Sequence, residues 1–152
     1  MKIHLNIGSN IGDRRAQIGR ACAMLAQSFA GAKLLLSDYV ESEAWGYNSS
    51  HKFLNRGVLV LSYEQLEAVE VLRRAQTVEK AICAAPHRRS DGSYADRAID
   101  IDVIDVDGLV VDTPELTLPH PRAALRAFVM GPMRELEERY SSMVGRSEGS
   151  SE

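Results

Sequence analysis

Arg97-Ala98-Ile99-Asp100-Ile101-Asp102-Val103 is the stretch that decides how this chain folds and what it does. Side chains alternate in direction along a β-strand, so Asp100 and Asp102 should share one face and the apolar residues the other. Same-face neighbours lie roughly 7 Å apart, where two carboxylates repel each other and lose hydration. Mg²⁺, a hard ion that binds carboxylates, waters and substrate phosphates, would relieve both costs. The alternative is a half-exposed edge strand whose polar face is acidic by chance, because any half-buried strand alternates.

Length and composition fit one globular domain. The chain has 152 residues, 45% hydrophobic and 26% charged, enough to bury a core without disulfide or metal staples. We expect a domain over 1–144 and a disordered polar tail over 145–152. The net charge of −3 argues against a nucleic-acid partner, and no apolar run is long enough for a membrane. Cys22 and Cys83 have no metal-ligand spacing and suit reduced, buried thiols, so we expect a cytoplasmic protein. We also expect a monomer.

The pattern of apolar residues predicts an α+β fold. The expected elements are strands over 1–7, 34–42, 53–62, 98–106 and 109–111, and helices over 13–30, 64–84 and 123–140. This order predicts a ferredoxin-like β-α-β-β-α-β core, in which helices pack on a largely antiparallel sheet, followed by a C-terminal hairpin and helix. In the first strand one face should be wet, with Lys2, His4 and Asn6 on it.

Three groups of residues carry recognisable motifs. They read LNIGSNIGDR at 5–14, ESEAWG at 41–46 leading to FLN at 53–55, and RAIDID at 97–102 continuing through LTLPHPR at 116–122 to RAFV at 126–129. Together they resemble the motifs LGSNLGDR, ETxPxG…FLN and RTIDLDIL…LTLPHPR…RAFVL of the 6-hydroxymethyl-7,8-dihydropterin pyrophosphokinase family. Each motif alone is weak, whereas all three in register over about residues 3–136 are specific.

The resemblance implies an enzyme of folate biosynthesis. Family members transfer a pyrophosphoryl group from ATP to the 6-hydroxymethyl group of 7,8-dihydropterin, and they release AMP and the pterin diphosphate. They use Mg²⁺, commonly as two ions that bridge the ATP phosphates. The implied ligands are therefore ATP, the pterin and Mg²⁺, and the implied location is the cytoplasm.

By the resemblance, the acidic strand and the basic residues around it hold the triphosphate. Asp100 and Asp102 would bind Mg²⁺, which neutralises charge on the phosphate oxygens and aligns the attacking and leaving groups. Arg97, His120 and Arg126 would bind phosphates, because guanidinium groups match phosphate oxygens and a histidine ring can donate to them. No residue is an obvious general base.

The resemblance also implies a pterin site. Asn55 would read the edge of the heterocycle, since an amide presents a donor and an acceptor side by side. Phe53 and Phe128 would stack on the ring, although core packing is the usual role of phenylalanine. The other implied members of this site are Ser42, Glu43, Trp45 and Asn10. A structural Asn10, and a Trp45 that only anchors its loop, are the alternatives.

The segment 85–96 departs from the family pattern. The family ends the helix before it with a Gly-Arg pair that is missing here, so His87, Arg88 or Arg89 would supply the ATP-binding arginine or its substitute. Tyr94 stands about where the family has tryptophan, and Asp96 replaces the proline before the arginine of the acidic strand.

Three other functions stay open at this point. A non-catalytic relative would keep the pterin residues and fail to turn over ATP, and the unusual 85–96 segment favours it. A different Mg²⁺-dependent nucleotide enzyme is opposed by Asn55 and the two phenylalanines. A ferredoxin-like interaction domain with a merely solvated acidic strand is opposed by the phosphate-suited Arg97, His120 and Arg126.

Overall fold

The computed structural model of the protein describes residues 1–43, 51–82 and 96–149. In chain order its elements are β1 (Lys2–Ser9), α1 (Arg14–Ser28), β2 (Lys33–Leu36), β3 (Val40–Ser42), β4 (Phe53–Leu61), α2 (Ala68–Ile82), β5 (Asp100–Val106), β6 (Val111–Asp112), β7 (Thr117–Leu118), the 3₁₀ helix η1 (Ala123–Leu125) and α3 (Ala127–Gly149). The predicted α+β composition is confirmed.

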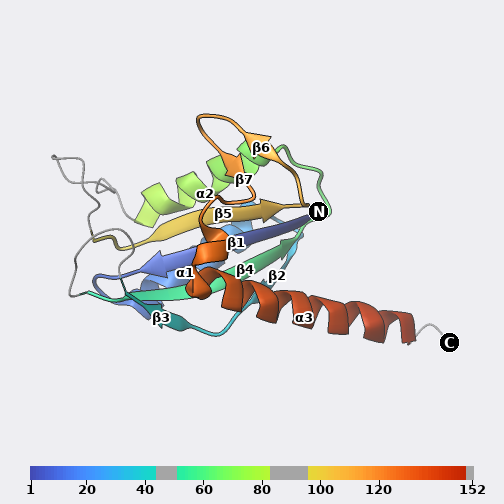
Figure 1. Cartoon of the computed structure of the whole chain (residues 1–152), viewed down its shortest axis with the longest axis horizontal. Coiled ribbons are helices and arrows are strands. Elements are labelled where there is room, and N and C mark those ends of the chain that lie inside the picture. The colour runs from blue at the N-terminus through green and yellow to red at the C-terminus, as the bar shows by residue number, and fades with distance from the viewer. Residues whose placement is uncertain (44–50, 83–95, 150–152) are drawn as a thin grey trace.

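The main sheet has the ferredoxin-like order that the sequence predicts. Within the described residues its strands run β2-β4-β1-β5, with β3 also paired to β4, and every pair is antiparallel (Figure 1). Because β1 and β2 both lie antiparallel to β4, α1 provides the crossover that places β4 between them. The central strand β1 thus separates β4, which carries Phe53 and Asn55, from β5, which carries Asp100 and Asp102.

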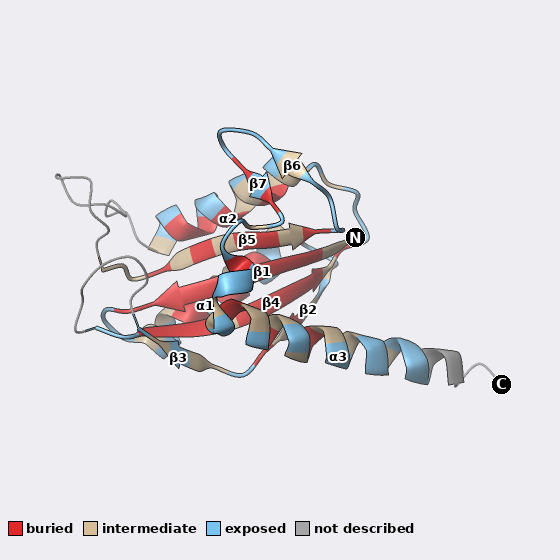
Figure 2. Cartoon of the chain, in the orientation of Figure 1, coloured by how far each residue is buried: buried red, intermediate tan, exposed pale blue. Residues whose placement is uncertain are grey.

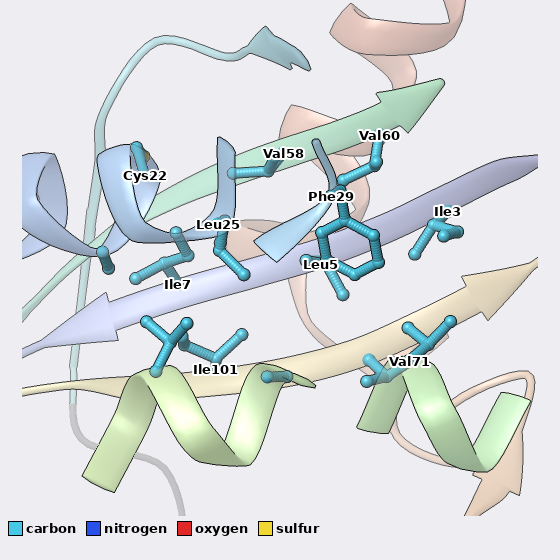
Figure 3. Close-up of a cluster of buried hydrophobic side chains, with 14 of the residues drawn as sticks. Ile3, Leu5, Ile7, Cys22, Leu25, Phe29, Val58, Val60, Val71 and Ile101 are labelled. Atoms are coloured by element: carbon cyan, nitrogen blue, oxygen red, sulfur yellow. The ribbon is translucent and has the colours of Figure 1, made fainter. Parts of the chain in front are cut away.

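One face of the sheet forms the main core. Ile3, Leu5 and Ile7 of β1 point to this face and are almost completely buried. They pack against residues of α1 and α2, among them Leu25 and Val71, in one continuous apolar cluster (Figure 3). The period of two on the strand and the helical spacing on α1 therefore meet at a single interface.

The opposite face of the sheet is not wet, so that prediction was wrong. α3 crosses this face (Figure 1), and His4 and Asn6 are only 3% and 4% exposed. His4 keeps a polar partner inside, because its Nε2 lies 2.6 Å from Glu137 Oε1 of α3. Gly57 of β4 allows close packing of the helix, since a Cβ there would lie 2.8 Å from the Cβ of Pro132.

The strand predicted over 34–42 is two strands. β2 and β3 both pair with β4, but their registers differ by one residue. Ser37 lies at the break, where its Oγ accepts the Gly57 N–H at 2.8 Å and its own N–H donates to the Gly57 carbonyl at 3.0 Å. The hydroxyl replaces a backbone acceptor there, so the regular ladder stops.

The C-terminal part differs from its prediction in two places. Asp107 and Gly108 form the predicted turn with positive φ angles of 51° and 69°. The segment 109–111 does not return along β5; instead Val111 and Asp112 form β6, which pairs with β7.

The last helix is also longer than predicted. It continues to Gly149 rather than ending near residue 140, and takes up 145–149 of the expected disordered tail. Beyond Pro132 no proline interrupts it, although residues 138–146 are mostly exposed (Figure 2). Among the described helices, none is long and apolar enough to cross a membrane.

Candidate functional site

A cavity of about 330 Å³ opens on the α3 face of the sheet, where α3 begins. This volume is in the range of small-molecule sites. The structure brings ten of the predicted site residues to its wall: Ser42, Glu43, Phe53, Asn55, Arg97, Asp100, Asp102, His120, Arg126 and Phe128. They come from β3, β4, β5, α3 and the connections beside them, so the fold collects residues that are far apart in the sequence.

The sheet register explains the floor of the cavity. Gly8 of β1 lies between Asn55 of β4 and Asp100 of β5, and in the next row Asn6 lies beside Asp102. A Cβ on Gly8 would come within 3.2 Å of both Asn55 Oδ1 and Phe53 Cδ1. Glycine therefore leaves open the space between the amide and the carboxylate.

Asp100 and Asp102 share a face, as predicted, while Ile101 and Val103 are buried on the other. The Nη1 of Arg97 lies 3.0 Å from Asp100 Oδ1, and that of Arg126 lies 3.8 Å from Asp102 Oδ2. Burial and then the charge of Asp100 raise the pKa of Asp102, against the opposing charges of Arg126 and Arg97, to about 7. Ionisation of Asp102 is therefore disfavoured in the ligand-free cavity.

Glu79 is a third carboxyl group beside this pair, and it is not among the site residues predicted from the sequence. It lies on α2, is 8% exposed, and its Oε2 accepts the Ile101 N–H at 3.1 Å. That N–H lies on the edge strand between the two aspartates, so Glu79 closes part of the open edge of the sheet. Burial raises the pKa of Glu79 to about 8, with the charge of Asp100 as the second cause. A sequence signal existed, because Glu79 follows Ala75 at helical spacing on the buried face.

His120 is held so that one ring nitrogen can face a ligand. Its backbone N–H donates to the Ile104 carbonyl at 2.9 Å, which ties the residue to β5. Its Nδ1 accepts the Arg122 N–H at 3.2 Å, so the hydrogen-bond network assigns the ring proton to Nε2. Burial and then the charge of Arg126 lower the pKa of His120, so the ring is neutral near pH 7. A neutral donor of this kind suits a phosphate oxygen.

The amide of Asn55 is fixed by β3. Its Nδ2 donates to the Val40 carbonyl at 3.1 Å and to Ser42 Oγ at 2.8 Å. Both donor hydrogens are thereby engaged, and Oδ1 lies at the open space above Gly8. In this arrangement Asn55 offers a ligand an acceptor, rather than the donor and acceptor together that the sequence suggested.

The two aromatic rings reach the cavity from separate elements. Phe53 is the first residue of β4 and Phe128 the second residue of α3. The guanidinium carbon of Arg126 lies 5.8 Å from the centre of the Phe128 ring, within the range of a cation–π contact. The cavity therefore combines flat apolar surface with charge.

Asn6 lines the cavity, although its place in the alternating pattern of β1 predicted a solvent-exposed side chain. It is 4% exposed, and its Oδ1 is buried without a hydrogen-bond partner among the described residues. Leaving a buried polar atom unsatisfied costs stability. Asn6 is identified as part of the site by the strand register, which places it beside Asp102. The alternation of β1 gave its face of the strand but not the neighbouring strand.

The remaining predicted residues do not line the cavity or cannot be placed. Asn10 is 2% exposed and does not line the cavity; its side chain bonds to Asp96 and to the Arg97 N–H. Trp45, His87, Arg88, Arg89 and Tyr94 lie outside the described residues, as does Cys83. Among the described residues, no group of three or more histidine, cysteine, aspartate or glutamate side chains is arranged to hold a metal ion by itself.

Comparison with known proteins gives a consistent result. The family model of 7,8-dihydro-6-hydroxymethylpterin-pyrophosphokinase (HPPK) matches residues 4–138. A protein of Porphyromonas gingivalis named 2-amino-4-hydroxy-6-hydroxymethyldihydropteridine pyrophosphokinase is 37% identical over 136 residues, 88% of this chain and 89% of its own length. Proteins of the same name from Bacillus subtilis and Mycobacterium tuberculosis are 30% and 35% identical, over 88% and 86% of this chain and 76% and 70% of theirs.

Proposed function

The chain belongs to the 7,8-dihydro-6-hydroxymethylpterin-pyrophosphokinase family, and we propose that it transfers a pyrophosphoryl group from ATP to the 6-hydroxymethyl group of 7,8-dihydropterin. The products are AMP and the pterin diphosphate, a step of folate biosynthesis. The family match and the names of the relatives support the pyrophosphokinase role, and nothing in them favours the non-catalytic alternative. The observation that carries the proposal is that one cavity joins an aspartate pair, phosphate-suited cations and two aromatic rings.

Asp100 and Asp102 fit Mg²⁺. Mg²⁺ is commonly bound by one or two carboxylates together with waters and substrate phosphates, so the pair needs no third protein carboxylate. Burial and the neighbouring Asp100 raise the pKa of Asp102, so a cation beside the pair would favour its ionised form. When bound, Mg²⁺, in one or two ions, would neutralise phosphate charge and align the reacting groups.

The other residues divide into a phosphate side and a pterin side. Arg97, Arg126 and the neutral His120 bind and orient the triphosphate, with His120 donating from Nε2. Phe53 and Phe128 hold the flat ring, and Asn55 accepts a hydrogen bond from its edge. The hydroxymethyl oxygen then attacks the β-phosphorus. Its bond to phosphorus forms while the bond from the β-phosphorus to the oxygen that leaves with AMP breaks, and the hydroxyl proton is released to water.

We further propose that the domain of residues 1–144 acts as a cytoplasmic monomer on these two small molecules. A turnover assay tests the reaction: purified protein, ATP, Mg²⁺ and 6-hydroxymethyl-7,8-dihydropterin, with AMP as the readout and reactions lacking pterin or containing EDTA as controls. We expect AMP only when pterin and metal are both present. No AMP from a protein that still binds pterin in calorimetry would contradict the proposal.

Variants of the aspartate pair test the metal assignment. Asp100→Ala and Asp102→Ala should each abolish most turnover while the circular dichroism spectrum stays native. Asp112→Ala, which removes an exposed carboxylate on β6, serves as the matched control and should turn over normally. Near-normal turnover by either cavity variant would refute the assignment of that aspartate.

A further inference from the structure

Three chain segments are tied together just beyond the cavity by Asn10, His51 and Asp96. Asn10 follows β1, His51 precedes β4, and Asp96 precedes β5, so the three residues lie at the same end of three neighbouring strands. We call this group the strand-end clasp.

The carboxylate of Asp96 is the bridge of the strand-end clasp. Its Oδ1 accepts from Asn10 Nδ2 at 2.8 Å, and its Oδ2 lies 2.7 Å from His51 Nδ1. Asn10 Nδ2 also donates to the His51 carbonyl at 3.2 Å. Asn10 is 2% exposed, whereas the side chains of Asp96 and His51 are 20% and 59% exposed. The clasp therefore joins a buried amide to an exposed ring through one carboxylate.

The clasp continues into Arg97. The Arg97 N–H donates to Asn10 Oδ1 at 2.8 Å, and the Asn10 N–H donates back to the Arg97 carbonyl at 3.1 Å. Both peptide groups of Arg97 are thus held by the residue that Asp96 orients. The guanidinium group of Arg97 then reaches the cavity, 3.0 Å from Asp100 Oδ1.

We propose that Asp96 and His51 are positioning residues for Arg97, and that the clasp sets nucleotide affinity through the placement of that arginine. The inference rests on the proposed function only in taking Arg97 as a phosphate-binding group. A guanidinium group that must match phosphate oxygens gains from a fixed backbone, because less conformational freedom is lost on binding. Neither Asp96 nor His51 lines the cavity itself.

The test measures binding without turnover. Calorimetry measures how tightly the full chain and its variants bind two ligands. One is the Mg²⁺ complex of α,β-methylene-ATP, whose bridging carbon prevents pyrophosphoryl transfer, and the other is the pterin. His51→Ala removes one exposed contact to Asp96, so it should weaken nucleotide binding by only about two- to fivefold. Asp96→Ala also removes the partner of a buried amide and should weaken it about tenfold or more. Pterin binding should change less than twofold.

Further variants separate positioning from simple stability. His51→Gln keeps a donor toward Asp96 and should recover most of the affinity. Asp96→Asn keeps one acceptor oxygen in place of two and should fall between the wild type and Asp96→Ala. Because His51 acts through Asp96, the double alanine variant should bind no worse than Asp96→Ala alone.

The chain contains a matched control pair in His4 and Glu137. Its Nε2–Oε1 distance of 2.6 Å resembles that of the clasp, but it joins β1 to α3 away from the cavity. Glu137→Gln should lower the melting temperature and leave nucleotide affinity unchanged. Clasp variants that lower only the melting temperature, or that weaken nucleotide and pterin equally, would overturn the proposal. A wild type that binds no nucleotide would overturn the proposed function, and the clasp with it.

Discussion

Replacing Asp102 with asparagine should stabilise the metal-free protein while it removes activity. Burial raises the pKa of Asp102 from 3.8 to about 7, so the folded protein holds this proton more tightly than the unfolded chain does. The stability that the group contributes is therefore complete below pH 3.8 and is lost as the pH rises toward 7. Asparagine cannot ionise, so Asp102→Asn should escape this loss.

The size of the effect follows from the pKa values. A difference of one between the folded and unfolded pKa corresponds to about 1.4 kcal/mol, so the rise from 3.8 to about 7 sets a ceiling of about 4 kcal/mol. Three features reduce this ceiling: the side chain is 29% exposed, Arg126 lies 3.8 Å away, and the nearby Glu79 also has a raised pKa. We therefore expect Asp102→Asn to add about 1–2 kcal/mol to the free energy of unfolding. For a chain of this length that is a rise in melting temperature of about 2–8 °C.

The assay is calorimetric unfolding at pH 5, 6.5 and 8 in EDTA. The melting-temperature advantage of Asp102→Asn should grow from pH 5 to pH 8, because ionisation of the wild-type carboxylate in the folded state becomes complete only above pH 7. Asp112→Asn, at an exposed site on β6, should show no such growth. Adding Mg²⁺ and α,β-methylene-ATP should reverse the order, since these ligands stabilise the wild type more.

Two results would refute this reasoning. One is an Asp102→Asn protein that melts below the wild type at pH 8 without metal. The other is an advantage of equal size at pH 5 and pH 8, which would mean that asparagine improves packing and that the charge of Asp102 carries no cost.

Other substitutions test the fold and the cavity floor. Gly57→Ala places a Cβ 2.8 Å from the Cβ of Pro132 and should lower the free energy of unfolding by about 1–3 kcal/mol. Gly19→Ala, in α1 with nothing within 4 Å, should raise it by about 0.5–1 kcal/mol. Thermal unfolding measures both, and changes of the same sign would contradict the packing argument. Asn6→Leu removes the buried, unsatisfied Oδ1 and should raise the melting temperature while it weakens ligand binding; a lower melting temperature would count against an energetic cost at Asn6. Phe128→Ala should weaken pterin binding about two- to tenfold and nucleotide binding less, as calorimetry can compare, and an equal loss of both would argue against stacking.

The sequence was sufficient for the features that depend on local periodicity. The alternation of β5 placed Asp100 and Asp102 on one face and the apolar residues on the other, and the helical spacing of α1 placed Ile18 and Leu25 in the core. The ferredoxin-like order followed from the order of elements, because helices between strands and short connections leave few antiparallel arrangements. The family motifs then predicted that ten described residues from separate elements share one site, which periodicity alone cannot show.

The sequence was insufficient where one element covers another. The polar side of β1 has the same alternation whether water or a helix lies against it, so the burial of His4 and Asn6 depends on α3, more than 120 residues later. Glu79 has the same difficulty, because its contact with the Ile101 N–H joins α2 to the edge of β5. Such residues are identified only once the sheet order and the faces of the helices are known.

Taken together, His4 and Asn6 show how one strand face can be used for stability at one end and for binding at the other. Both are polar and nearly fully buried on the same face of β1. His4 lies under α3 and has Glu137 as a partner, so its burial is compensated. Asn6 lies two residues further on, in the cavity beside Asp102, where its Oδ1 has no partner among the described residues and the neighbouring carboxyl pKa is raised. A ligand that brings cations and hydrogen-bond donors would satisfy Asn6 Oδ1 and the Asp102 carboxylate. Binding then recovers the free energy that these buried groups cost the ligand-free fold. Substitutions that stabilise the empty cavity should therefore weaken ligand binding.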